Sequence, residues 1–142
     1  MKVLLAQTDT TVGFLSQDPL RLGEIKMRDC AKPFLKVFSD FKTLKEHTRI
    51  PNRYKNWVRR AKKTTFVVKN QAFRYVSDPS HASLIARHGW FYSTSANPSG
   101  GSYENLFCVQ NADWIVEDDR GLCELSPSRI FKLGHRRFQK IR

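Results

Sequence analysis

Short apolar runs alternate along this chain with segments of helical periodicity, and this alternation constrains the fold more than any other feature. Runs rich in β-branched and aromatic residues, typical of buried strands, lie at residues 3–7, 33–38, 64–68, 90–92, 114–116 and 129–133. Helices are expected at residues 41–49, 51–63, 80–88 and 103–109. Strands and helices that interleave within 142 residues, without repeats, predict one mixed α/β domain.

Two helix starts carry specific signals. Asp18 followed by Pro19 is typical of a cap and a first helical residue, and Gly23 predicts that this helix ends early. Ser80 is expected to cap a later helix that stops at Gly89.

The charge is strongly unbalanced, with 25 Lys and Arg against 13 Asp and Glu, a net charge of +12. This excess favours phosphate-bearing partners, either nucleic acid or a nucleotide. The alternative is a basic surface that serves solubility alone. The last residues, 134–142, hold four Lys and Arg, one His and no acid, and are expected to form a frayed basic tail after a domain of residues 1–133.

Cysteine and histidine usage excludes several classes of protein. Cys30, Cys108 and Cys123 are odd in number and show no C-x-x-C spacing, which argues against a disulfide framework and a zinc ribbon. No H-E-x-x-H occurs, so no metal site is predicted. The apolar start is too short for a signal peptide, and no stretch approaches the roughly 20 apolar residues of a membrane span. A soluble protein of the reducing cytoplasm, without a membrane partner, is expected.

Two cations in Lys26-x-Arg28, followed by Lys32, form the first candidate binding element. On extended backbone, side chains two residues apart point the same way, so both could hold neighbouring oxygens of a triphosphate. A solvated run of charge is the alternative.

Two polar loops form the other candidates. Residues 93–101 are small or polar and follow an aromatic strand, at the place where α/β sheets bind ligands. An ordinary surface loop would also favour Ser, Asn and Gly there. The triplet Thr8-Asp9-Thr10 ends the first strand with three hydrogen-bonding side chains, although Asp9 could cap a local turn and do nothing more.

Together, these segments resemble the YrdC-like family of threonylcarbamoyl-adenylate synthases. Residues 7–14, 26–33, 94–100 and 127–129 are similar, in that order, to the family segments P-T-[DE]-T-x-Y-G-L, K-x-R-x-x-x-[KN]-P, [ST]-S-A-N-x-S-G and P-S-T. Ser-Ala-Asn-Pro-Ser-Gly is the specific match, and the resemblance spans residues 4–133. It implies a YrdC-like fold, with a twisted mixed sheet, helices and an open basic groove.

The resemblance also implies an activity. The family members are nucleotidyltransferases that condense L-threonine, bicarbonate and ATP into threonylcarbamoyl-adenylate and pyrophosphate, with Mg²⁺ escorting the ATP. The product serves threonylcarbamoyladenosine formation on tRNA, so tRNA and other proteins of tRNA threonylcarbamoylation are expected partners.

Site residues follow from the same resemblance. Lys26 and Arg28 would be catalytic, holding the ATP phosphates and stabilising charge on the departing pyrophosphate. The residues implied to bind nucleotide or substrate are Thr8, Thr10, Lys32, Ser95, Ala96, Asn97 and Ser128. Such a site acts by positioning and electrostatics and needs no covalent nucleophile.

The chain departs from the family pattern at three places. Val12 replaces an aromatic residue, Arg129 replaces the last Thr of P-S-T, and residues 60–64 lack the usual P-G-P-x-T turn. These departures keep a second hypothesis open: a YrdC-like module that binds double-stranded RNA or tRNA with little or no synthase activity. Its candidate RNA contacts lie on the helix predicted at residues 51–63 and are Arg53, Arg59, Arg60, Lys62 and Lys63.

Overall fold

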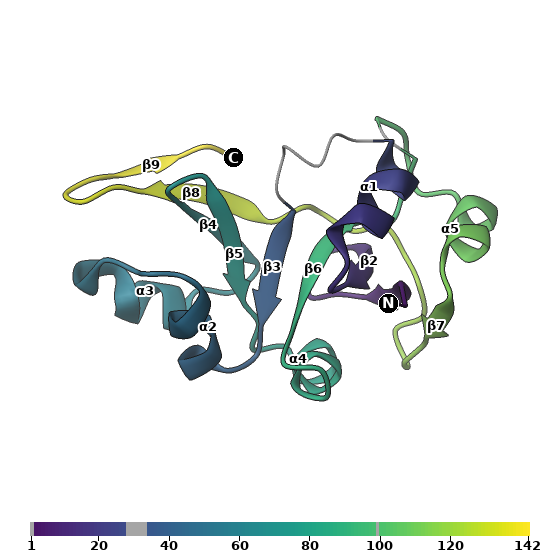
Figure 1. Cartoon of the computed structure of the whole chain (residues 1–142), viewed down its shortest axis with the longest axis horizontal. Helices are drawn as coiled ribbons and strands as arrows, with labels where there is room; N and C mark the ends of the chain where they lie inside the picture. Colours follow the sequence, from purple (N-terminus) through teal and green to yellow (C-terminus); the bar gives the residue numbers. More distant parts are fainter. Residues whose placement is uncertain (1, 28–33, 99) are drawn as a thin grey trace. The chain divides into compact units, whose positions relative to one another are not determined.

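The computed structural model describes residues 2–27, 34–98 and 100–142. Contacts divide the chain into two units. Figure 1 labels the helices and strands of both units. Unit 1 is Met1–Phe34 with Phe91–Ser126, and unit 2 is Leu35–Trp90 with Pro127–Arg142. Each unit therefore combines a segment from the first part of the chain with one from the second.

Unit 1 is built on four strands in the order β7-β1-β2-β6. Their bounds are β1 Leu4–Gln7, β2 Val12–Ser16, β6 Trp90–Ser95 and β7 Trp114–Val116, and the helices are α1 Pro19–Lys26 and α5 Asn105–Asn111. β1 pairs antiparallel with β2 and parallel with β7, and β2 pairs antiparallel with β6. The predicted polar loop after the first strand is thus short, because β2 already begins at Val12.

The core of unit 1 packs both helices against these strands. Leu5, Phe14, Leu22 and Cys108, which come from β1, β2, α1 and α5, are fully buried in one cluster. Burial of such side chains supplies the main stabilisation of a unit of this size, about 1.5–3 kcal/mol for each large apolar residue.

Helix α1 confirms its predicted start and corrects its predicted end. Asp18 Oδ1 accepts from the backbone N–H groups of Leu20 (3.0 Å) and Arg21 (3.4 Å). The helix continues through Gly23 to Lys26, and Met27, in the left-handed region at φ 51°, ends it. The early end predicted at Gly23 is wrong, because burial of Leu22 and Lys26 on either side of this glycine outweighs its weak helix propensity.

Unit 2 contains five strands in the order β3-β5-β4-β8-β9. Their bounds are β3 Leu35–Phe38, β4 Thr64–Val68, β5 Gln71–Tyr75, β8 Arg129–Leu133 and β9 Phe138–Lys140. The helices are α2 Phe41–His47, the short 3-10 helix η1 Asn52–Tyr54, α3 Lys55–Arg60 and α4 Pro79–Ala86. β3 and β8 pair parallel with β5 and β4, whereas β4–β5 and β8–β9 are antiparallel.

An aromatic cluster in unit 2 explains why the basic tail is ordered. Trp57 of α3 lies with its ring centroid 4.8 Å from Phe131 of β8 and 5.0 Å from Phe138 of β9. Phe138 therefore anchors β9 to α3, and edge-on aromatic pairs of this kind add about 0.5–1.5 kcal/mol each. The expectation of a frayed end at residues 134–142 is wrong.

The cap of helix α4 is Asp78, whereas Ser80 was predicted. Asp78 Oδ2 accepts from His81 N at 3.1 Å, and Pro79 is the first helical residue. Asp78, not Ser80, is therefore the cap, as expected for the residue that precedes a helix-starting proline.

The α/β class and the mixed pairing of strands are confirmed in both units. Among the described residues, no helix is long and apolar enough to cross a bilayer.

Candidate functional site

The connection between β1 and β2 is a buried turn that holds both predicted threonines. Thr8 Oγ1 donates to the carbonyl of Thr11 at 2.5 Å and accepts from Thr10 N at 3.2 Å, while the two hydroxyls lie 3.3 Å apart. Thr8, Asp9 and Thr10 are all at most 9% exposed. The triplet therefore lies at the end of β1, as predicted, in a turn fixed by its own hydrogen bonds.

Arg120, which lies in the connection after β7, contacts the backbone of this turn. The Arg120 guanidinium lies 3.4 Å from the carbonyl oxygens of both Gln7 and Thr8. Arg120 also pairs with Asp118 at 2.7 Å, and its hydrogen bonds hold the pKa of that carboxyl below the usual value. Arg120 was not predicted, because no sequence motif signals it.

Gln7 is the second residue near this turn that was not predicted. Its Oε1 accepts from Cys123 N at 2.9 Å, which fixes the orientation of the amide. Its Nε2 is buried and has no hydrogen-bond partner in the described part of the chain. An unpaired buried donor costs about 1–3 kcal/mol, so this amide is a candidate to bind water or a ligand atom beside the Thr8 turn.

Strand β6 runs beside β2 and ends at Ser95, the first residue of the predicted Ser-Ala-Asn segment. Ser93, Thr94 and Ser95 pair with Leu15, Phe14 and Gly13. The predicted loop at residues 93–101 is therefore wrong in its first three residues, which are strand, because β2 offers them a partner. The loop proper begins with Ala96.

Lys26 joins α1 to this loop. Its ammonium donates to Ser95 O at 3.1 Å, Asn97 O at 2.8 Å and Asn97 Oδ1 at 2.9 Å. The side chain is 6% exposed, and Asn97 Oδ1 also accepts from Ser95 Oγ at 2.6 Å. The structure thus brings together Lys26, Ser95 and Asn97, three of the predicted site residues.

Val12 and Cys108 hold the first residue of this loop, Ala96, through its backbone. Ala96 N donates to Val12 O at 2.9 Å, and the Cys108 thiol donates to Ala96 O at 3.1 Å. Burial raises the pKa of Cys108, which keeps it in the protonated form that this hydrogen bond needs.

Gly13 allows the Thr8 turn and strand β6 to approach closely. A Cβ at this position would lie 3.1 Å from both Thr8 Cγ2 and the carbonyl oxygen of Thr94. Because Gly13 pairs with Ser95, the turn and the Ser95 loop flank the same glycine. Thr8 and Ser95 therefore belong to one cluster.

The backbone at Lys26 differs from the prediction made for the Lys26-x-Arg28 segment. Lys26 is the last residue of α1, so the extended conformation predicted for it is wrong. Arg28 and Lys32 lie outside the described residues, and their roles stay predictions.

Ser128 belongs to unit 2, where it lies in a buried polar group. Its hydroxyl is 2.8 Å from Thr65 Oγ1, which also accepts from Arg74 Nε at 3.2 Å. Arg142 Nε donates to Ser128 O at 2.9 Å. Arg74 is only 6% exposed. Arg74 was not predicted, because no motif was assigned to β5.

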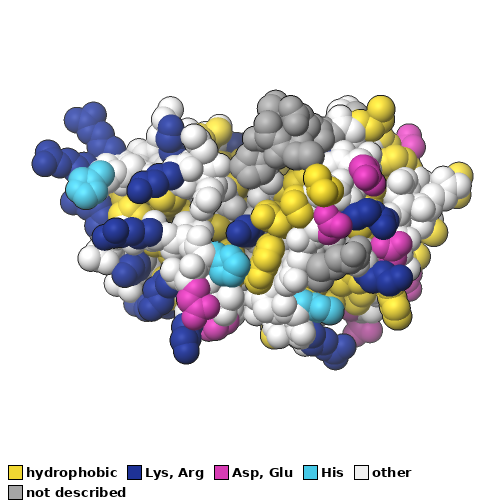
Figure 2. Space-filling model, viewed as in Figure 1, with side chains coloured by type: hydrophobic (Ala, Val, Ile, Leu, Met, Phe, Trp, Pro, Cys, Tyr) yellow, Lys and Arg dark blue, Asp and Glu magenta, His cyan; other side chains and the backbone are white. Residues whose placement is uncertain are grey.

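The predicted RNA contacts are all exposed residues of unit 2. Figure 2 shows Lys and Arg side chains crowding the surface over α3, β8 and β9. Arg59 stacks over the Phe41 ring at 4.5 Å, and Arg53 Nη1 donates to Arg136 O. By sequence, unit 2 holds 19 Lys and Arg against 3 Asp and Glu, a net charge of +16, whereas unit 1 holds 6 against 10, a net charge of −4. The basic excess of the chain therefore belongs to unit 2 alone.

A caged metal site is not formed by the described residues, where no group of three or more His, Cys, Asp and Glu side chains could hold an ion. Mg²⁺ that accompanies a nucleotide needs no such cage, because it keeps several waters and binds largely through substrate phosphates.

No family model and no curated protein matches the sequence. Solved structures do match the fold. Sua5 of P. abyssi complexed with L-threonine superimposes with a TM-score of 0.80 at 17% identity, over 99% of this chain and 50% of Sua5. E. coli YciO gives a TM-score of 0.78 at 16% identity, over 99% of this chain and 82% of YciO. Full-length HypF in its phosphate- and nucleotide-bound form gives 0.78 at 15% identity, over 99% of this chain and 26% of HypF.

These similarities confirm the YrdC-like fold that the sequence resemblance implied. At such identities they show the fold alone, and the chain spans about half the length of Sua5.

Proposed function

On the premise that the chain has the YrdC-like fold, we propose that it is a nucleotidyltransferase that makes threonylcarbamoyl-adenylate from L-threonine, bicarbonate and ATP. The observation that carries the proposal is the contact of the Lys26 ammonium with the Ser95 and Asn97 loop, at 2.8–3.1 Å. Two motif segments that are 69–71 residues apart in sequence meet there around one buried cation.

The proposed chemistry needs a cation at the phosphates. The threonine nitrogen and bicarbonate form a carbamate with loss of water, and a carbamate oxygen then attacks the α-phosphorus of ATP. The bond from that phosphorus to the bridging oxygen breaks, and pyrophosphate leaves with the electron pair. A largely buried ammonium such as Lys26 stabilises this departing charge more strongly than an exposed one, because the surrounding dielectric is lower.

The contacts of Lys26 are compatible with this role. Three of its acceptors, two backbone carbonyls and the Asn97 side-chain oxygen, are neutral. A phosphate oxygen would compete with them effectively, because it adds the attraction of an opposite charge to the hydrogen bond. Ser95 Oγ and Asn97 Nδ2 would then be donors to the nucleotide.

The Thr8 turn supports a threonine subsite in the same unit. Thr8 and Thr10 offer two hydroxyls, and Gln7 adds a buried amide whose Nε2 has no partner in the described part of the chain. Sua5, which shares the fold, was solved with L-threonine bound, and HypF with nucleotide and phosphate. In our proposal, Thr8, Thr10 and Gln7 seat the amino acid, and ATP enters with Mg²⁺ held by its own phosphates.

The test is release of pyrophosphate that depends on threonine. The pure protein is incubated with ATP, bicarbonate and Mg²⁺, with and without L-threonine. Lys26→Met is expected to lower kcat/KM by about 10²–10³-fold, as does the loss of a charge-stabilising donor elsewhere. Lys2→Met, which removes an exposed lysine of the same unit, is the matched control and should retain activity. Wild-type protein that releases no pyrophosphate with threonine would refute the synthase.

The second candidate, an RNA-binding module, is favoured by one observation, the net charge of +16 in unit 2. Exposed Arg59, Arg60, Lys62 and Lys63 would contact backbone phosphates. The measurement is binding of double-stranded RNA or tRNA that falls steeply with salt and survives Ser95→Ala and Asn97→Ala. Binding lost with those two substitutions would contradict this module.

A further inference from the structure

A cavity of about 770 Å³ opens in unit 2, and none of the residues that line it is used in the synthase proposal. It lies where three connections meet: the chain between α2 and η1, the β4–β5 turn and the β8–β9 turn. β4 and β8 run parallel, with Thr64 opposite Arg129 and Val67 opposite Lys132, so both strands end at the cavity. Ser128 and Thr65 lie at the opposite, starting ends of these strands. The cavity is therefore separate from the Ser128 group.

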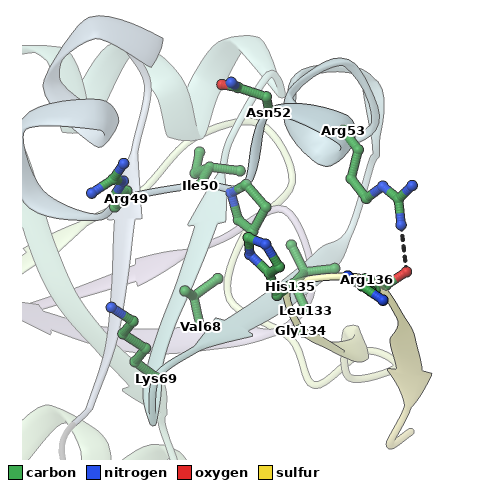
Figure 3. Close-up of a pocket in the computed structure, with 11 residues that line it drawn as sticks. Arg49, Ile50, Asn52, Arg53, Val68, Lys69, Leu133, Gly134, His135 and Arg136 are labelled. Atoms are coloured by element: carbon green, nitrogen blue, oxygen red, sulfur yellow. Dashed lines mark hydrogen bonds between the residues drawn. The ribbon is translucent and has the colours of Figure 1, made fainter.

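The floor of the cavity is apolar. Ile50 and Leu133 are each 4% exposed and Val68 7%, and all three belong to the core of the unit. Figure 3 shows these side chains between the connections that form the walls. Such a floor suits a flat apolar group, and the volume is within the range of about 300–1,000 Å³ usual for small-molecule sites.

The rim of the cavity is cationic. Figure 3 shows Arg49 and Lys69 on one side and Arg53 and Arg136 on the other, with His135 between them. Of the residues that line the cavity in the described chain, none is Asp or Glu. Arg forks and a Lys ammonium that face one opening match the oxygens of a phosphate.

The walls are held in place before any ligand binds. Arg53 Nη1 donates to Arg136 O, which joins the η1 wall to the β8–β9 turn, and Gly134 N donates to Arg137 O at 2.7 Å within that turn. Lys69 projects from a tight hairpin turn in which it and Asn70 have φ of 50° and 64°. A preformed site binds its ligand more tightly, because little binding free energy is lost in ordering side chains and loops.

We propose that this cavity binds a nucleoside phosphate, with the ring on the apolar floor and the phosphate among the rim cations. The ligand is either a free nucleotide or one nucleotide of an RNA strand, since both offer the same ring and phosphate. The proposal does not depend on the synthase, because no residue of the Lys26 cluster takes part.

The first experiment locates binding. Methyl-labelled protein is titrated with AMP and, separately, with a short single-stranded RNA, while the methyl resonances of Ile50, Val68 and Leu133 are followed. Shifts at these methyls with AMP assign a free-nucleotide site, and shifts with RNA alone assign a strand site. The same titrations in Lys26→Met should give unchanged shifts, which separates this cavity from the synthase site.

The second experiment measures how much the cations at the rim contribute to ligand affinity. Arg49→Gln with Lys69→Gln removes two cations of the cavity, and Lys42→Gln with Arg87→Gln removes two exposed cations of the same unit that do not line it. We expect affinity to fall about tenfold in the cavity variant and less than about threefold in the control, with the salt slope for RNA reduced by about 1.4 in the former. Equal losses in both variants, or floor methyls that do not shift with either ligand, would overturn the proposal.

Discussion

Lys26→Met tests the contact from which the candidate site was built. Met keeps an unbranched apolar stem and removes only the ammonium, so the loop loses one donor group while the packing of α1 is largely retained. Of the three acceptors, Ser95 O still accepts from Asn97 N at 3.1 Å and Asn97 Oδ1 still accepts from Ser95 Oγ at 2.6 Å. Among described residues, only Asn97 O loses its sole hydrogen bond.

The expected loss of stability is therefore that of one part-buried acceptor. An unpaired buried carbonyl costs about 1–3 kcal/mol and a part-buried one less, and loss of a cation from the last turn of α1 adds about 0.3–1 kcal/mol. Met avoids the cost of burying a charge, which offsets part of this sum. We expect the free energy of unfolding to fall by about 1 kcal/mol, equivalent to a Tm lower by about 2–4 °C for a chain of this size.

Urea unfolding followed by circular dichroism measures the global loss, with an unchanged m-value as the sign that the compactness of both states is kept. Hydrogen exchange at Ala96 N, which donates to Val12 O, measures the loop itself. Lys2→Met should stay within about 0.5 kcal/mol of wild type, as is usual for surface substitutions. A Lys26→Met protein as stable as this control, with unchanged exchange at Ala96, would refute the reasoning.

Three further predictions concern other parts of the fold. Gly13→Ala should lower the free energy of unfolding by about 1–3 kcal/mol, because its Cβ would lie 3.1 Å from a backbone carbonyl, whereas Gly101→Ala, whose nearest contact is 3.5 Å, should change it little in the same urea assay. Cys108 should react with a thiol reagent far more slowly than exposed Cys123 in native protein, as peptide mapping would show, because burial raises its pKa; equal rates would contradict this. Burial lowers the pKa of His47 below 6.5, so the unfolded state binds more protons there; stability should fall as pH drops below about 6.5, and less so in His47→Gln.

The sequence predicted the elements whose signals are local. β4 and β8 have the bounds expected from their β-branched and aromatic composition, and β7 does as well. β2 was missed because Gly13 suggests a turn. In the structure this glycine instead lies inside a strand, where it allows a neighbouring backbone to approach closely. β5 was missed because its hairpin turn is Lys69-Asn70, which lacks the Gly of common two-residue turns.

The candidate site was only partly predictable, and only through the resemblance. Nothing in the spacing of Lys26 and Asn97 indicates that the two residues touch, because long-range contacts depend on strand order. The supports of the site, Arg120 and Gln7, bind backbone groups across 112–116 residues of sequence, and such contacts leave no periodic pattern. Phe138 was missed for a similar reason, since its partner Trp57 is remote in sequence.

The partition of charge between the units leads to one more prediction, on salt. The bulk value of +12 suggests a uniformly basic protein, but unit 1 has a net charge of −4. In the proposed synthase, unit 1 would bind phosphates with few cations, and Lys26 is only 6% exposed. Salt screens exposed charges much more than buried ones. Raising salt from about 50 to about 200 mM should therefore weaken binding of double-stranded RNA to unit 2 roughly fortyfold if about three phosphates are contacted. Threonine-dependent pyrophosphate release at saturating ATP should change far less. At saturation the rate no longer depends on the affinity for ATP, and the buried Lys26 ammonium that stabilises the leaving group is screened little by salt. Turnover that falls as steeply as RNA binding would mean that exposed cations, and not Lys26, stabilise the departing pyrophosphate.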